Sequence, residues 1–150
     1  MSMTTIAHNP RAKFDYEFLE TYEAGIVLFG HEVKSVKTGH ISLKGAFVTA
    51  SDGELFLTNA MIPLYPHAGK IPNYDPSRSR KLLLNKHEIR TLLGKNKTAG
   101  LTMVPIRVYI KGKHIKVAFA LARGKKEYDK RHTIKKRDAD RTIARALRTR

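Results

Sequence analysis

The chain contains no cysteine among its 150 residues. Without thiols it can form neither a disulfide nor a thiolate metal site. Its longest apolar runs are only a few residues, whereas a helix needs about 20 to cross a bilayer. The first residues, MSMTTIAHNPRAK, lack the apolar segment of a secretory signal. We therefore expect a cytoplasmic protein with one domain plus extensions.

Patterns that carry catalysis are also missing. There is no G-x-S-x-G and no phosphate-binding P-loop, and no two of the seven histidines lie three or four residues apart. Asp15, Glu17, Glu20 and Glu23 could hold magnesium, as in a metal-dependent nuclease. A solvated strand face explains such a cluster more simply. We expect no enzymatic activity, no metal and no cofactor.

Acidic residues are scarce relative to basic ones. The 29 Lys and Arg outweigh 13 Asp and Glu, which gives a net charge of +16. Half of this charge lies in residues 123–150, where twelve Lys or Arg accompany four Asp or Glu. Such a balance predicts a polyanionic partner. Nucleic acid is favoured over an anionic membrane, because the basic tail has too few large apolar residues for a membrane-surface helix.

Alternating apolar residues and turn signals predict a mainly β protein. We expect a strand at residues 14–18, a turn at 20–25 and one long bent strand at 26–39. Asp52-Gly53 is the strongest hairpin signal, and Lys111-Gly112-Lys113 is a second one. The strands joined by these turns are expected at residues 47–50, 55–58, 101–110 and 114–122.

One helix and one long loop complete the predicted fold. Asn85 with Glu88 three residues later has the form of a capping box, and an apolar helical stripe follows up to Gly94. Four prolines in residues 61–76 predict a surface loop. The sum is a small antiparallel OB-like barrel of about six strands at residues 10–122. A flexible segment (1–9) precedes it, and a basic tail (123–150), disordered when free, follows it.

Within the barrel, one acidic residue lies in basic surroundings. Glu32 is followed by Lys34 and Lys37, and further basic groups precede the helix. Glu32 is either a charge partner for Lys34 or a nearby arginine, or an acceptor for base and sugar donors of RNA. The residues alone leave both roles open.

Three stretches in this order resemble the small protein B family, the bacterial transfer-messenger-RNA-binding proteins of trans-translation. They are GHEVKSVKTG (residues 30–39), RSRKLLLNKHEI (78–89) and ARGKKEYDKR (122–131). His31 departs from the family, which often has Trp there. The end of the chain, IARALRTR, follows the family only in being basic with a thin apolar face.

The resemblance implies a non-enzymatic adaptor that binds the tRNA-like domain of transfer-messenger RNA. With that RNA it would mimic a tRNA and rescue ribosomes stalled without a usable stop codon. The tail would lie in the empty mRNA channel near the decoding centre, against small-subunit RNA. Elongation factor Tu is expected as a partner through the RNA, and the protein is expected to be a monomer. A general RNA-binding or ribosome-associated OB-fold protein is the alternative.

The predicted RNA contacts combine this resemblance with the basic groups. Those in the barrel are Arg11, Lys13, Glu32, Lys34, Ser35, Lys37, Arg80, Lys81, Leu92 and Leu93. Residues 135–150 could form a helix on binding, with arginine on one face and a thin apolar stripe on another. The predicted tail contacts are Lys125, Lys126, Tyr128, Asp129, Lys130, Arg131, His132, Lys135, Lys136, Arg137, Arg141, Ile143 and Arg145.

Overall fold

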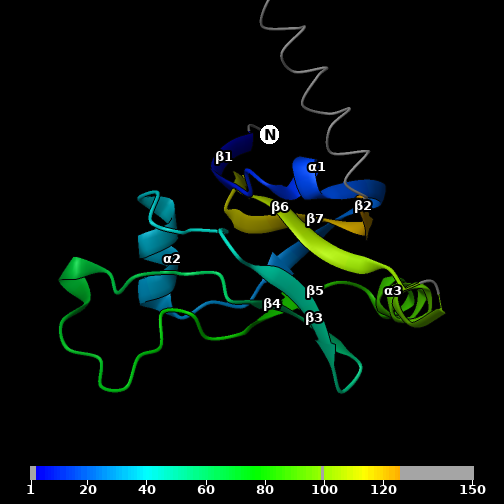
Figure 1. Ribbon diagram of the computed structural model, residues 1–150. Coiled ribbons are helices and arrows are strands. Elements are labelled where there is room, and N and C mark those ends of the chain that lie inside the picture. The colour runs from blue at the N-terminus through cyan, green and yellow to red at the C-terminus, as the bar shows by residue number, and fades with distance from the viewer. Residues whose placement is uncertain (1–2, 99, 126–150) are drawn as a thin grey trace, which may run out of the picture.

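The computed structural model describes residues 3–98 and 100–125 (Figure 1). Seven antiparallel strands form the body of the molecule, and α2 and α3 lie on opposite sides of it (Figure 1). Within these residues no helix has the length and apolar character of a membrane span. The elements are β1 (Met3–His8), α1 (Ala12–Asp15), β2 (Tyr16–Ile26), α2 (Gly30–Lys37), β3 (Phe47–Ser51), β4 (Glu54–Thr58), a 3₁₀ turn (Pro66–Ala68), β5 (Arg80–Leu83), α3 (Lys86–Thr98), β6 (Thr102–Lys111) and β7 (His114–Gly124).

The sheet closes on itself. Around the ring the order is β6, β3, β4, β5, β2 and β7, and β7 pairs again with β6. The long strand β6 pairs with β3 at Met103, and β1 covers the same edge from Arg107 to Lys111. Closure removes free strand edges. The predicted antiparallel barrel is confirmed, with seven strands in place of about six.

Both predicted hairpins are confirmed by the strand register. Ser51 pairs with Glu54, and the turn residues Asp52 and Gly53 have φ angles of 51° and 75°. A two-residue turn with positive φ at both positions matches the twist of the strands and favours Asp-Gly. Lys111 pairs with His114 in the same way, with Gly112 at a φ of 62°.

The turn predicted at residues 20–25 is wrong, because β2 runs unbroken through them. Glu20 to Gly25 all pair with β7, and Gly25 also pairs with Leu83 of β5. A Cβ atom on Gly25 would lie 3.4 Å from the Leu83 Cβ. Gly25 therefore marks a close approach of two strands and not a turn.

The bent strand predicted at residues 26–39 is also wrong. Gly30–Lys37 forms α2, and Glu32, Ser35 and Val36 are its buried residues. Their spacing of three and four is helical. The Phe29 N–H donates to Glu32 Oε1 at 2.8 Å, which satisfies a backbone group at the helix start. Val33 and Val36, which were expected in the bent strand, fit this helix equally well.

Two further predictions change at element ends. The helix after Asn85 is confirmed, since Asn85 Oδ1 accepts from the Glu88 N–H at 2.8 Å, but α3 passes through Gly94 to Thr98. The N-terminal segment, predicted to be flexible, forms β1 over Met3–His8. Its pairing with β6 gives its backbone groups partners that local sequence signals do not show.

One continuous core fills the barrel. It includes Leu55, Leu57, Leu82, Phe119 and Leu121 from the strands, all at most 1% exposed. The helices add Val36 and Leu92, both fully buried. Each such side chain contributes roughly 1.5–3 kcal/mol of burial free energy. Because both helices are anchored in this core, their outward faces are presented on a rigid body.

Candidate nucleic-acid interface

A buried ion cluster joins α2 to β5. Glu32 Oε2 lies 2.6 Å from Arg80 Nη2 and 2.9 Å from Arg80 Nε, and both side chains are fully buried. Arg78 contacts both carboxylate oxygens and is partly exposed. Its guanidinium lies 3.8 Å from the centroid of the Phe29 ring. Every oxygen of Glu32 therefore has a charged partner.

The same cluster holds the long loop between β4 and β5 against the barrel. Arg80 donates to the Ala60 carbonyl at 2.7 Å and to the Pro76 carbonyl at 2.9 Å. The Tyr74 hydroxyl lies 2.7 Å from the Ile62 carbonyl and 3.0 Å from Glu32 Oε2. Ser35 Oγ of α2 donates to the Pro63 carbonyl at 2.9 Å. These side chains hold in place a proline-rich loop that does not form a strand of the sheet.

Glu32 is charged in this setting. Burial raises the pKa of its carboxyl, but hydrogen bonds from Arg78, the Phe29 N–H and Arg80 together lower that pKa to about 2. A buried carboxylate that accepts several charge-assisted hydrogen bonds stays ionised. Of the two roles left open for Glu32, the geometry favours that of a charge partner. The arginines that it pairs with are Arg78 and Arg80.

Four of the predicted RNA contacts have buried side chains. Glu32, Arg80 and Leu92 are 0% exposed and Ser35 is 1% exposed. The physical reason is the same for all: each side chain is turned into the core or the ion cluster. Their contribution to an interface is to position the exposed residues of α2, α3 and the loop.

The other predicted barrel contacts are accessible but lie in separate places. Lys34 and Lys37 are exposed on α2, whereas Arg11 and Lys13 are exposed at α1. The remaining two, Lys81 of β5 and Leu93 of α3, are partly exposed, and Lys81 Nζ lies 2.8 Å from Glu54 Oε1. The structure thus divides the predicted set among several elements and does not gather it into one cluster.

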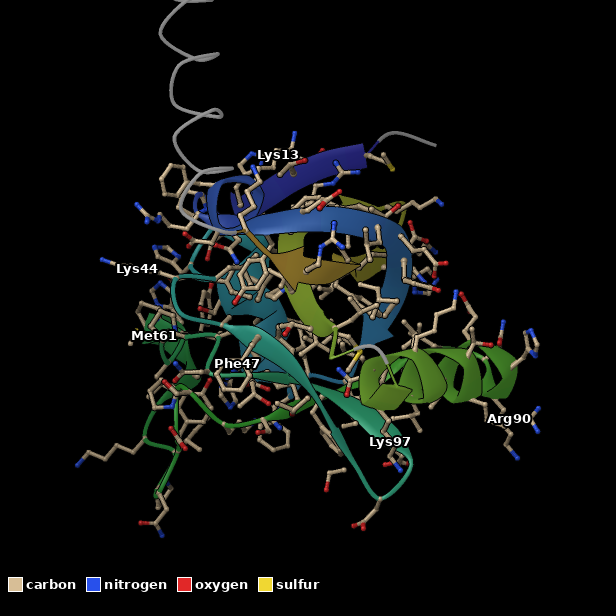
Figure 2. The ribbon with its side chains drawn as sticks, turned by 45° about the vertical axis from the view of Figure 1, so that its right-hand side comes forward. Lys13, Lys44, Phe47, Met61, Arg90 and Lys97 are labelled. Carbon is tan, nitrogen blue, oxygen red and sulfur yellow. The ribbon has the colours of Figure 1, made fainter. Side chains whose placement is uncertain are left out.

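Sequence reasoning missed several exposed side chains. Phe29, Phe47 and Met61 are 53%, 43% and 52% exposed. Lys44 also lies at the surface, and Figure 2 shows it with Phe47 and Met61 on one side of the barrel, while Arg90 and Lys97 extend from α3. The signal for Phe47 was available, because it opens a strand in which the next residue, Val48, faces the core.

The acidic cluster near the start of β2 is engaged in ion pairs. Glu20 contacts Lys95 at 2.5 Å, Glu17 contacts Arg123 at 2.5 Å, and Glu23 contacts Tyr109 and Lys111. The hydrogen bonds from Lys95 and Tyr22 lower the pKa of Glu20, and the one from Tyr109 lowers the pKa of Glu23. Over residues 3–98 and 100–125, no three potential metal ligands gather.

The predicted tail contacts fall almost entirely outside the described residues. This applies to Lys126, Tyr128, Asp129, Lys130, Arg131, His132, Lys135, Lys136, Arg137, Arg141, Ile143 and Arg145. Lys125 is described: its backbone N–H donates to the Asp15 carbonyl at 2.8 Å. The predicted boundary at residue 122 falls inside β7, which continues to Gly124.

Comparison with known proteins identifies the family. The model of the SmpB protein family matches residues 6–149. The SsrA-binding protein of Chloroflexus aggregans is 49% identical over 148 residues, which is 99% of this chain and 94% of the relative. That of Enterococcus faecalis is 48% identical, covering 95% and 92%. A solved structure described as "tmRNA-SmpB: a journey to the center of the bacterial ribosome" is 52% identical, with a TM-score of 0.64 over 80% of this chain and 84% of the other. The chain belongs to the SmpB family.

Proposed function

We propose that the protein is an RNA-binding adaptor of trans-translation. It binds the tRNA-like domain of transfer-messenger RNA and carries it to stalled ribosomes in the cytoplasm. The observation that carries this is the identity of about half of all residues with SsrA-binding proteins over nearly the whole chain. The net charge of +16 supports a polyanionic partner.

The barrel supplies RNA selection in this proposal. Lys34 and Lys37 on α2, with Arg11 and Lys13 at α1, would neutralise phosphates from fixed positions. Glu32, Arg80, Ser35 and Leu92 act from inside, by holding α2, α3 and the loop in place. Phosphate contacts give affinity without sequence preference, so selectivity would come from the fit of this rigid surface to a folded RNA.

The tail supplies the ribosomal contact. Residues 123–150 carry twelve Lys or Arg, enough to track an RNA-lined channel. We place Lys125, Lys126, Tyr128, Asp129, Lys130 and Arg131 in the empty mRNA channel near the decoding centre. The arginines Arg137, Arg141 and Arg145 would face ribosomal RNA of the same channel. Elongation factor Tu would join through the RNA, and no catalytic step is assigned to the protein.

Competition binding tests the choice of RNA. The full-length protein is titrated against a labelled transcript of the tRNA-like domain at physiological salt, in the presence of excess bulk tRNA. We expect the transcript to remain bound. If bulk tRNA displaced it in proportion to its concentration, the protein would be a general RNA binder and the proposed partner would be wrong.

Truncation tests the division between barrel and tail. A chain ending at Lys125 keeps β7 and the hydrogen bond to Asp15. We expect it to bind the transcript with little loss and to fail in tagging peptides on stalled ribosomes. Loss of transcript binding, with unchanged thermal unfolding, would contradict this division.

A further inference from the structure

A hollow of about 430 Å³ opens on the barrel between α1, the segment before β3 and the start of β6. Its lining includes the buried residues Ala12, Val48 and Val104. Two aromatic residues, Tyr16 and Phe47, also line it. Tyr16 is half-buried, whereas Phe47 is exposed and so gives up burial free energy that its ring could gain.

The aromatic side of the hollow is fixed in place. Phe47 begins β3 and pairs with Thr58 of β4, and Val48 behind it is 5% exposed. Asn59 Nδ2 donates to the Gly45 carbonyl at 3.1 Å, which ties down the preceding segment. Phe47 itself remains 43% exposed. A rigid ring held open to solvent costs little ordering entropy when a planar ligand stacks on it.

Polar groups also line the hollow. Asn9 Nδ2 donates to the Pro105 carbonyl at 3.0 Å, which leaves its amide oxygen as an acceptor. The Arg11 guanidinium lies 4.6 Å from the centroid of Phe14 and 3.5 Å from Asp15 Oδ1, yet its side chain is 67% exposed. Arg11 is therefore held in orientation while its donors remain open to solvent.

Two lysines flank the hollow. Lys13 follows the lining residue Ala12, and Lys44 precedes Gly45. Both are exposed, and Figure 2 shows them with Phe47 on the same side of the barrel. The hollow thus combines buried apolar residues, two aromatic rings, a hydrogen-bond donor and an acceptor, with two lysines nearby. An apolar peptide would match only the apolar and aromatic residues of this lining.

We propose that this hollow receives one unpaired nucleobase of the bound RNA. The base stacks on Phe47 and Tyr16, its edge meets Asn9 and Arg11, and the adjoining phosphates lie near Lys13 and Lys44. Unstacked bases of folded RNAs bind to proteins in this manner, through aromatic stacking and hydrogen bonds to their edges. The inference rests on the proposed function and adds to it a site that distinguishes an extruded nucleotide from a regular duplex.

Phe47 variants of the full chain test the stacking. Affinity for the tRNA-like-domain transcript is measured by filter binding over a range of salt concentrations. Phe47→Ala should weaken binding about 10-fold, because the base would lose the aromatic ring on which it stacks. The dependence of log K on log salt should keep its slope, since no charge is removed. Phe47→Tyr should restore affinity.

Leu83→Ala is the matched control, because Leu83 is 52% exposed on β5 and does not line the hollow. It should bind like the parent protein. An equal loss in both variants, or no loss in Phe47→Ala, would overturn the base pocket and leave the proposed function standing. Failure of the parent protein to prefer the transcript over bulk tRNA would instead overturn the function itself.

Crosslinking provides a second measurement that does not depend on folding of a variant. A transcript containing 4-thiouridine is irradiated with the full-length protein, and the crosslinked peptides are sequenced. We expect adducts at Phe47 or Tyr16 with a single-stranded nucleotide. Adducts confined to α2 or α3 would place the RNA on another face and would overturn the proposal.

Discussion

Glu32 Oε2 and Arg80 Nη2 lie 2.6 Å apart inside the protein, although their residues are 48 positions apart in the chain. Neither side chain is exposed. Desolvation opposes an ion pair at such a depth, so its net contribution to stability is smaller than its short distance suggests. The pair fixes the position of α2 on β5, because Arg80 without Glu32 would be a buried and uncompensated charge. The positions of Lys34 and Lys37 on the outer face of α2 depend on this arrangement.

Glu32→Gln should reduce the free energy of unfolding by about 3–5 kcal/mol at pH 7, because Arg80 would stay buried without its counter-charge. The measurement is chemical denaturation followed by circular dichroism. Glu54→Gln is the control, since Glu54 pairs with Lys81 at a position where both side chains are more than 40% exposed. It should change stability by less than about 1 kcal/mol. Equal effects of the two substitutions would contradict a structural role for the buried pair.

The stability of the protein should depend on Glu32 in acid. Its pKa is about 2 in the folded protein against an ordinary value of 4.5. Because the folded-state pKa is the lower one, the contribution is complete above pH 4.5 and is lost as pH falls towards 2. Subtracting the Glu32→Gln stability curve from that of the parent removes the effect of other carboxylates. A difference that stays constant between pH 5 and pH 2 would contradict the assignment.

Lys34 and Lys37 should contribute to RNA affinity through charge. Substitution of either by Gln should weaken binding to the tRNA-like-domain transcript and lower the slope of log K against log salt by about 1. Thermal unfolding should not change, because both side chains are exposed. Filter binding at several salt concentrations measures the slope. If the slope stayed the same for both variants, α2 would lie away from the phosphates.

Two glycines should respond in opposite ways to alanine. Gly53 has a φ of 75° in the hairpin turn, so Gly53→Ala should destabilise the protein by about 1 kcal/mol or more. Gly30 begins α2 with open space around its Cα. Gly30→Ala should therefore be neutral or stabilising by up to about 1 kcal/mol. Denaturant midpoints of the two variants give the comparison, and a loss at Gly30 would indicate an unrecognised contact there.

Short-range chemistry was sufficient to predict the hairpins and α3. Asp52-Gly53 determines its turn through the φ angles of two adjacent residues, and Asn85 caps α3 three residues away. The strands β1 and β5 were missed because their existence depends on partners far along the chain. Gly25 was misread as a turn residue for the same reason, since only the approach of Leu83 explains it.

The site was less predictable than the fold. The motif around Glu32 identified a special position, but its partners Arg78 and Arg80 are 46 and 48 residues away. No local pattern distinguishes a buried carboxylate from one that faces a ligand. The helical spacing of Glu32, Ser35 and Val36 is present in the sequence, but the apolar run at residues 26–29 and the apolar Val33 and Val36 favoured a strand interpretation. Lys34 and Lys37 lie at the surface, where their charge alone would place them.

The hydrogen bond from the Lys125 N–H to the Asp15 carbonyl gives the basic tail a fixed origin. Residues 126–150 follow this point, and a chain of that length can reach at most about 85 Å from it. The anchor lies beside α1 and the hollow lined by Arg11 and Phe47. The way an RNA docks on that side of the barrel would therefore determine the point from which the tail starts. A change of docking angle at the barrel would move this starting point, with no alteration in the tail itself.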